Sequence, residues 1–180
     1  MEYKKKRCKN CGELFAIVRF NQKYCFESEC VAVWVQSEKQ KQWKQRKTKL
    51  KNELLGVQDW VKIAQGTFNK WVNLRDNGLP CISCQKPING RVNASHYFNA
   101  NNHWNVRFDP DNVHSSCVPC NQHLSGNLHE YRIQLIKKIG LKRFEELEEK
   151  ARITRKFTVE ELKQITDVYK ILCKSIGNKK

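Results

Sequence analysis

The sequence predicts a mostly helical α+β protein in which small zinc-stabilised units are flanked by helices. Its 180 residues have a hydrophobic content of 39% and a mean hydropathy of -0.73, which disfavours one large apolar core. Eight of the nine cysteines fall into two groups of four with the short spacings of metal sites. Several segments without proline carry strong helix formers or apolar residues at helical spacing.

The chain is strongly basic, with 34 Lys and Arg against 18 Asp and Glu, a formal net charge of +16 and a pI near 9.6. Two Zn²⁺ ions held by eight thiolates would leave about +12. This excess predicts an anionic polymer as partner, although solubility alone would favour the same composition. No apolar run approaches a membrane span, and MEYKKKRCKNC has no signal-peptide apolar region. We therefore expect a reducing cytosol and zinc-bound thiols rather than disulfides.

Residues 1–36 are predicted to form a four-cysteine zinc ribbon or knuckle. Tetrahedral zinc takes four thiolates, and a CxxC turn lets two of them reach one ion. The run LFAIVRF between the cysteine pairs predicts a short strand. The alternative is a set of four buried free thiols, which a segment this short and polar disfavours. The expected ligands are Cys8, Cys11, Cys25 and Cys30.

Residues 37–56 are predicted to be a basic helical connector. The segment is rich in helix formers, and its lysines surround the helix instead of leaving one apolar stripe, so the helix has little to pack with. Two roles stay open at this point: a solvated connector, or a basic arm along phosphates. With Arg107 from the central unit, the candidate DNA-binding residues are Lys44, Arg46, Lys47, Lys51 and Arg107.

Residues 57–140 are predicted to contain an amphipathic helix followed by a second zinc unit. The helix should end at Asn77-Gly78. We expect its apolar face to pack on the zinc unit, and the alternative is an aromatic platform for nucleic-acid bases. Apolar residues recur at three- and four-residue steps in this helix, and the main ones are Trp60, Ile63, Ala64, Phe68, Trp71 and Leu74.

The second zinc unit is bounded by two CxxC pairs, Cys81 with Cys84 and Cys117 with Cys120. The intervening segment is long enough for a β-hairpin, and we expect a helix to begin directly after the last cysteine. Hairpin, zinc and helix in that order predict a ββα unit. With a His near the end of the first strand and an Asn before the second CxxC, this pattern suggests a treble-clef or HNH-like (ββα-metal) nuclease core.

Residues 141–180 are predicted to form C-terminal helices. Thr158 and Glu161 have the spacing of a capping box at the start of the last helix. That helix carries apolar residues along one side. Cys173 has no cysteine near it in sequence and is interpreted as a core or surface thiol, not a metal ligand.

Together, LRDNGLPCISC, SHY, RFDPDNVHSSCVPCNQHLSGN and EYRI resemble the phage NinG (also called Rap) recombination-protein family over most of the chain. The resemblance implies a phage-encoded, structure-selective DNA endonuclease in the host-cell cytosol. Its substrates would be branched recombination intermediates such as D-loops and Holliday junctions. It also implies a catalytic divalent metal, Mg²⁺ or Mn²⁺, beside two structural zinc ions.

In the HNH-like arrangement the general base is a His at the end of the first strand, here His96. Asn112 would fix the loop before the second CxxC and orient the base. Either Asn121 or His123 would hold the catalytic metal or the phosphate. His114 is interpreted as a packing or hydrogen-bonding residue.

The sequence departs from the usual HNH pattern at two positions. Ser95 stands where many of these enzymes place an Asp or His before the base, and Asn121 replaces the third His. Neutral oxygens hold Mg²⁺ weakly. Asn93, Asp109 or Asp111 would be substitute ligands, although both aspartates also fit a simple turn.

These departures leave two functions open. One is the metal-dependent endonuclease, for which symmetric cutting of a junction would favour a homodimer. The other is a non-catalytic zinc-bearing DNA-binding protein that assists phage recombination.

Overall fold

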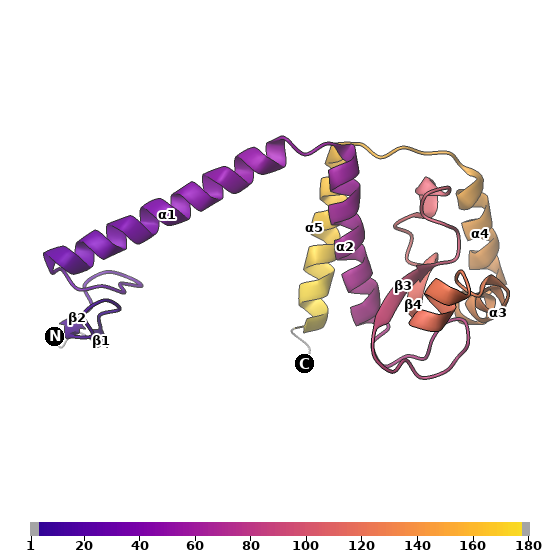
Figure 1. The fold of residues 1–180 in the computed structure, drawn as a ribbon, viewed down its shortest axis with the longest axis horizontal. Coiled ribbons are helices and arrows are strands. Elements are labelled where there is room, and N and C mark those ends of the chain that lie inside the picture. The colour runs from indigo at the N-terminus through magenta and orange to yellow at the C-terminus, as the bar shows by residue number, and fades with distance from the viewer. Residues whose placement is uncertain (1–3, 178–180) are drawn as a thin grey trace. The chain divides into compact units, whose positions relative to one another are not determined.

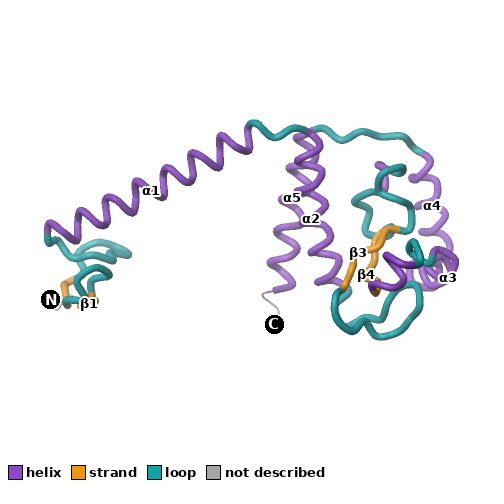
Figure 2. Tube along the Cα trace, viewed as in Figure 1, coloured by secondary structure: helices purple, strands orange, loops and turns teal. Residues whose placement is uncertain are grey.

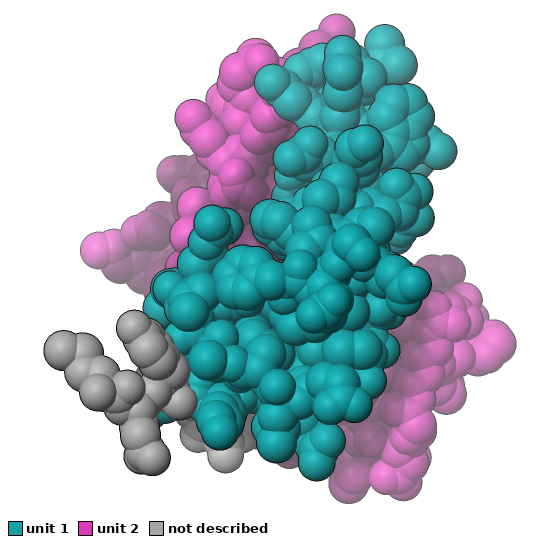
Figure 3. Space-filling model, turned by 90° about the vertical axis from the view of Figure 1, so that its left-hand side faces the viewer, with its two compact units in different colours: residues 1–55 teal, residues 56–180 magenta. Residues whose placement is uncertain are grey.

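The structure is a computed structural model and describes residues 4–177. The chain forms two compact units, Met1–Leu55 and Gly56–Lys180 (Figure 3). Unit 1 combines one helix with a two-stranded sheet and unit 2 combines several helices with another, so the prediction of a mostly helical α+β protein is confirmed (Figure 2). Within residues 4–177, no helix has both the length and the apolar character that crossing a bilayer requires.

Unit 1 begins with strands β1 (Lys5–Arg7) and β2 (Leu14–Ala16), which pair antiparallel with Lys6 opposite Phe15. The strand predicted from LFAIVRF ends earlier than expected, at Ala16. The backbone turns after it, because Gln22 N–H donates to the Arg19 carbonyl and Asn21 adopts a left-handed φ of 57°.

Helix α1 (Ser28–Glu53) completes unit 1. The expected division at residue 36 falls inside this helix, because no glycine or proline interrupts residues 28–55. Cys30, in its first turn, is the only buried residue of the helix. The rest of α1 therefore presents side chains to solvent on all sides, as its lysine pattern predicts.

Unit 2 pairs helix α2 (Val57–Arg75) with the last helix, α5 (Val159–Gly177), and the two lie side by side (Figure 1). The Phe68 ring lies 4.7 Å from that of Tyr169 and 5.8 Å from that of Phe108. The apolar face of α2 is thus core, as expected, but α5 supplies much of its cover. Val61 and Val72 are buried there too, whereas Ile63 is 37% exposed.

The hairpin consists of β3 (Val92–His96) and β4 (Val113–Cys117), which pair antiparallel with His96 opposite Val113. The end of α2 is tied to β4. The Ser115 N–H donates to the Asp76 carboxylate at 2.9 Å, and Arg75 Nη2 donates to the Val113 carbonyl at 2.7 Å. This fixes the hairpin against α2.

The chain after β4 differs from the expected helix. A π-helical turn spans Pro119–His123, but regular helix α3 (Leu128–Ile139) starts only at Leu128. The break comes from Ser125, Gly126 and Asn127, whose φ values of 49°, 93° and 48° are all left-handed. The Gly126 N–H then donates to the Cys120 carbonyl at 2.8 Å, which anchors this loop to the last cysteine.

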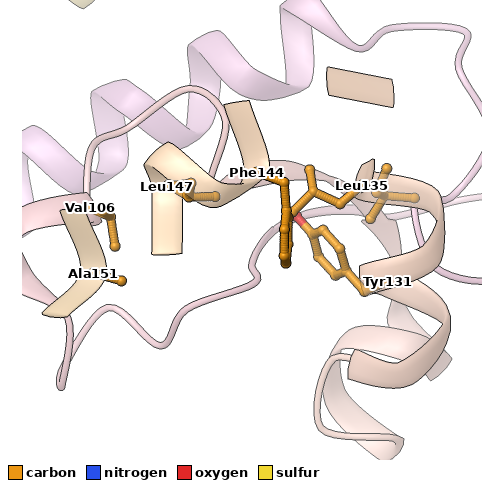
Figure 4. Close-up of a cluster of buried hydrophobic side chains, with 7 residues drawn as sticks. Val106, Tyr131, Leu135, Phe144, Leu147 and Ala151 are labelled. Carbon is orange, nitrogen blue, oxygen red and sulfur yellow. The ribbon is translucent and has the colours of Figure 1, made fainter. Parts of the chain in front are cut away.

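Helix α4 (Leu141–Arg152) packs beside α3 in one hydrophobic cluster (Figure 4). A short 3₁₀ turn, Trp104–Val106, contributes Val106 to the same cluster. The expected division at residue 140 therefore separates two helices that share a core, because the turn at Gly140 folds α4 back onto α3. The cluster comprises Ile82, Val106, Tyr131, Leu135, Phe144, Leu147 and Ala151.

Candidate metal centres and active-site pocket

The first cysteine cluster, Cys8, Cys11, Cys25 and Cys30, brings four sulfurs within 4.8 Å of one another. The Sγ atoms of Cys11 and Cys25 are 3.8 Å apart. Tetrahedral zinc with Zn–S bonds of about 2.3 Å places its sulfurs about 3.8 Å apart. The four residues therefore fit a structural zinc ion.

Backbone amides favour a thiolate in this cluster. Burial by itself would raise the pKa of the Cys8 thiol, but N–H groups from Cys25 and Asn10 donate to its sulfur and hold that pKa at about 6. The pKa of Cys25 is instead raised to about 12: a backbone hydrogen bond lowers it, while burial and the neighbouring thiols raise it more. A divalent cation is what allows four such close thiols to ionise together.

The second cluster has the same arrangement inside unit 2. The Sγ atoms of Cys84 and Cys117 are 3.8 Å apart, and Cys81 and Cys120 are buried. Burial would raise the pKa of Cys81, but the Ser116 hydroxyl and nearby N–H groups lower it to about 6. This cluster also fits zinc, and it joins the loop after α2 to the end of the hairpin.

A pocket of about 420 Å³ lies beside the end of β3. Its lining comes from three segments: the end of β3, the loop that follows it, and the turns after Cys120. The structure thus brings together His96 and Asn121, which are 25 residues apart in sequence. Besides Tyr97, the polar residues that line it are Ser95, His96, Asn99, Asn101, Asn121 and Ser125.

His96 is held in a defined tautomer. Its Nε2 lies 3.1 Å from the Arg107 carbonyl oxygen, which can only accept, so Nε2 carries the hydrogen and Nδ1 has the free lone pair. Burial lowers the pKa of His96 to about 4; the hydrogen bond to Arg107 opposes this shift, and the Arg107 charge adds to it. The imidazole is therefore neutral at pH 7 and able to accept a proton.

A hydrogen-bonded chain supports the strand behind the pocket. The Tyr131 hydroxyl donates to the Ser95 carbonyl at 2.9 Å, and His114 Nδ1 donates to that hydroxyl at 3.3 Å. Burial lowers the pKa of His114 to about 3, so it too is neutral. His114 thus has a hydrogen-bonding position within the core and does not line the pocket.

Asn112 is fully buried and satisfied by the backbone. Its Nδ2 donates to the carbonyls of Phe98 and Val106 at 3.0 and 2.9 Å, and its Oδ1 accepts from the Phe98 N–H at 2.7 Å. These bonds fix the loop that leads from His96 to β4. Asn112 itself does not line the pocket, and its contacts reach the loop after His96 and not the imidazole.

The structure separates the two candidates for the third position. Asn121 lines the pocket, whereas His123 is exposed and lies outside its lining. Both sit on the same π-helical turn, so only the path of that turn distinguishes them. Asn121 therefore shares the pocket with His96, and His123 does not.

The two aspartates that the sequence offered as substitute metal ligands, Asp109 and Asp111, lie outside the pocket lining. Asp109 pairs with Lys150 at 3.2 Å, and Asp111 accepts from Arg143 Nε at 3.0 Å, which ties both aspartates to α4. Asn93 is also outside the pocket lining, and its Nδ2 is buried without a hydrogen-bond partner. The pocket thus offers neutral oxygens and one imidazole, which fit only a weakly held Mg²⁺ or Mn²⁺ ion.

The chain matches one protein family and its relatives over most of its length. The family model described as Bacteriophage Lambda NinG protein matches residues 1–179. This chain belongs to the NinG family. Protein ninG of Escherichia phage lambda is 33% identical over 193 residues, covering 97% of this chain and 94% of the relative. Protein ninG of Salmonella phage P22 is 34% identical over 184 residues, covering 92% and 90%. No solved structure matches the chain.

In this NinG chain the predicted DNA-binding residues have two different environments. Lys44, Arg46, Lys47 and Lys51 are exposed on α1. The half-buried Arg107 guanidinium instead donates to Gln65 Oε1 at 2.8 Å and to the Ala100 carbonyl at 3.1 Å. Arg107 thus braces the loop whose carbonyl holds His96.

Sequence reasoning missed three pocket residues of the NinG chain, Asn99, Asn101 and Ser125. The polar run NANNH after the first strand is a signal for the first two, since polar loops beside a candidate base often bind substrate. Ser125 gave no such signal, because its position depends on the left-handed turn after Cys120.

Proposed function

We propose that this NinG-family protein is a structure-selective, metal-dependent DNA endonuclease that acts on branched recombination intermediates such as D-loops and Holliday junctions. The observation that carries the proposal is His96, a neutral imidazole with Nε2 held by the Arg107 carbonyl, in a pocket shared with Asn121. The proposal includes an HNH-like ββα core, and the antiparallel hairpin, the second cysteine cluster and the helical turn after it support that part of the proposal.

In the proposed reaction, His96 Nδ1 takes a proton from a water molecule as that water attacks the phosphorus. The new P–O bond forms as the bond to the leaving oxygen breaks, and solvent protonates the leaving oxygen. A Mg²⁺ or Mn²⁺ ion held by Asn121 and the phosphate would supply Lewis-acid stabilisation of the developing charge. Zinc held by either cysteine cluster would have a structural part only, because the four thiolates would fill a tetrahedral ion's positions.

The basic character of the chain supports a DNA substrate. The exposed lysines of α1 can neutralise phosphates without reading sequence, as expected for a protein that recognises branch structure. Symmetric cutting of a four-way junction requires two active sites, and we include a homodimer on the junction in the proposal.

One observation favours the second candidate function, a non-catalytic zinc-bearing DNA-binding protein assisting recombination. The residues lining the pocket include no carboxylate, so its affinity for a catalytic cation rests on neutral oxygens. The two functions differ in whether the purified protein cuts DNA.

The test is cleavage of a synthetic four-way junction with Mg²⁺ or Mn²⁺. His96→Ala should lower the single-turnover rate by about 10²- to 10⁴-fold, with zinc content and junction affinity unchanged. The control is His123→Ala, a histidine 27 residues away that is exposed and outside the pocket. Asn121→Ala should raise the metal concentration needed for half-maximal rate. A well-folded His96→Ala protein that cuts at the wild-type rate would refute the assignment, and a wild-type protein that cuts no branched DNA would favour the binding function.

The pH profile gives a second readout. Because the pKa of His96 is lowered to about 4, the base stays unprotonated from neutral pH down to about pH 5. We expect kcat/KM to lose no activity through His96 protonation near pH 6.5, the ordinary histidine range, and to fall only near pH 4.

A further inference from the structure

A second pocket lies within unit 1, and its lining residues are far in sequence from His96. It has a volume of about 590 Å³, larger than the pocket at His96, and lies between the loop Arg19–Phe26 and one side of α1. Volumes of this size are typical of ligand sites. Its lining includes basic and aromatic side chains, among them Lys9, Arg19, Phe20, Lys23, Phe26 and Trp34.

Three aromatic side chains in this pocket are unusually exposed. Phe20 is 102% exposed, Phe26 60% and Trp34 44%. In the part of the chain that the structure describes, none of the three packs ring against ring with another aromatic side chain. Their rings are therefore free to stack on a ligand, and they contribute little to the core of this small unit.

Basic side chains surround these rings. Lys9, Arg19 and Lys23 make no ion pair with an acidic side chain within residues 4–177. Lys41 pairs with Glu38 at 3.8 Å, but its side chain is 64% exposed, so water screens that pair. The pocket combines uncompensated positive charge with flat aromatic surface, which complements an anionic ligand that carries planar rings.

The first cysteine cluster positions this pocket. The Lys9 N–H donates to the Lys23 carbonyl at 2.9 Å, and the Cys25 N–H donates to Cys8 Sγ at 3.3 Å. The Gln22 side chain accepts from the Val18 N–H and donates to the Tyr24 carbonyl, which fixes the loop between them.

The same cluster sets the side of α1 that closes the pocket. Cys30, one of the four cysteines that could hold zinc, lies in the first turn of the helix. Val31, Trp34, Glu38 and Lys41 then follow at three- and four-residue steps on one side of α1, and all four line the pocket.

We propose that this pocket binds unpaired bases of single-stranded DNA, which stack on Phe20, Phe26 and Trp34 while phosphates contact Lys9, Arg19 and Lys23. Aromatic platforms inside a positively charged groove bind single strands in this way, because every base has a stacking face. Duplex DNA has no free base faces, and an acidic peptide would use the lysines but leave the aromatic rings unmatched. The proposal concerns unit 1 alone and does not depend on cleavage at His96.

The test compares three DNA ligands with the full-length, zinc-loaded protein, without Mg²⁺ or Mn²⁺. The ligands are a short oligothymidylate, an abasic phosphodiester strand of equal length and charge, and a blunt duplex. We expect wild-type protein to prefer oligothymidylate to the abasic strand. Phe20→Ala and Trp34→Ala should each weaken oligothymidylate binding by about 5- to 150-fold and leave abasic binding unchanged.

The matched control is Trp43→Ala, which removes a tryptophan that is 66% exposed on the same helix but does not line the pocket. It should leave the preference for bases intact, and zinc content confirms folding of each variant. Equal wild-type affinity for the oligothymidylate and abasic strands would overturn the proposal. A second result would also overturn the proposal: an acidic peptide binds the pocket and oligothymidylate does not displace it. That result would indicate a protein partner. Retention of the preference in His96→Ala separates this result from the fate of the nuclease proposal.

Discussion

The two units contain the same four-cysteine centre in very different surroundings. In unit 1 the cluster of buried apolar residues consists of Cys8, Cys25 and Cys30, with Phe15 and Tyr24 partly buried beside them. Unit 2 buries large side chains throughout, including Phe68, Tyr131, Leu135, Phe144 and Leu162. The same four-cysteine arrangement therefore forms the core of unit 1, whereas in unit 2 it only links the loop after α2 to the end of the hairpin.

Charge separates the units as well. Unit 1 carries 14 of the 34 basic residues and 6 of the 18 acidic ones within its first 55 residues. It therefore holds half of the net charge of +16 in less than a third of the chain. Unit 1 is therefore densely basic around its cysteine cluster, whereas unit 2 combines its cysteine cluster with an apolar core. In the proposed function, unit 1 would hold DNA and unit 2 would position the reactive group.

Loss of zinc should produce the largest difference between the units. Cys8→Ser should unfold β1, β2 and the loop after them, because zinc binding supplies on the order of 10 kcal/mol in such small centres. Cys81→Ser should disorder the hairpin end, while the α2–α5 pair keeps its aromatic contacts. Amide hydrogen exchange measured by segment checks this, and equal loss of protection in α2 and α5 on Cys81→Ser would show that zinc is also the core of unit 2.

Truncation of an aromatic side chain should lower the free energy of unfolding much more in unit 2 than in unit 1. Phe68 is fully buried, so Phe68→Ala should lower the free energy of unfolding by about 3–5 kcal/mol. Trp43→Ala removes an exposed ring in unit 1 and should change it by less than about 0.5 kcal/mol. Urea unfolding followed by circular dichroism measures the free energy of unfolding of both variants. Equal losses would contradict the prediction, because they would mean that the Trp43 ring is packed in the folded protein.

Acid should destabilise unit 2 through Asp76. Its burial would raise the pKa of this carboxyl, but hydrogen bonds from Arg75 and the Ser115 N–H, with the charges of Arg75 and Lys138, lower that pKa below its usual range. A lowered pKa means stabilisation that is present above the unfolded-state pKa, near 4, and lost as pH falls through the folded value.

The variant that tests this is Asp76→Asn. It should cost about 1.5–3 kcal/mol at pH 7, the usual worth of a hydrogen bond to a charged group, and progressively less below pH 4. The urea midpoint measured across pH checks the prediction. A cost that stays constant down to pH 2 would show that the charge of Asp76 has no part in stability.

Removal of a helix cap should have a smaller effect. The Thr158 hydroxyl accepts from the Glu161 N–H at 3.2 Å, and Glu161 accepts from the Thr158 N–H at 2.9 Å. Thr158→Ala should therefore cost about 1 kcal/mol by weakening the start of α5. The control in unit 1 is Thr48→Ala, in the exposed interior of α1, where alanine is the better helix former and no loss is expected. Thermal unfolding of both variants distinguishes them.

Charge removal on α1 should barely change stability and should act on DNA binding instead. Lys44, Lys47 and Lys51 are exposed, so changing all three to Gln should alter the free energy of unfolding by less than about 0.5 kcal/mol. If each contacts a phosphate, the slope of log affinity against log salt should flatten by about 2.7. The matched control is the same change at Lys137, Lys142 and Lys174 of unit 2, and an equal flattening there would assign the effect to net charge alone.

The sequence by itself determined the features that depend on short spacings. The short cysteine spacings predicted both four-cysteine clusters: three of the four pairs are CxxC, and Cys25 and Cys30 have four residues between them, so each pair can bring its sulfurs to one ion. Thr158 and Glu161 formed the capping box that their spacing predicts. The apolar steps of residues 57–74 likewise gave the buried face of α2.

Tertiary structure alone decided which distant residues meet. Spacing along the chain did not determine whether Asn121 or His123 would share a pocket with His96. The course of the π-helical turn and the left-handed turn at residues 125–127 place Asn121 in that pocket and leave His123 outside it. By sequence alone, Asp109 and Asp111 were candidate metal ligands. In the structure they form ion pairs with Lys150 and Arg143 of α4, which lie more than thirty residues later in the chain. Local spacing fixes local geometry because few backbone torsions lie between the residues concerned, whereas long-range pairing depends on every turn between them and on which surfaces the core must bury.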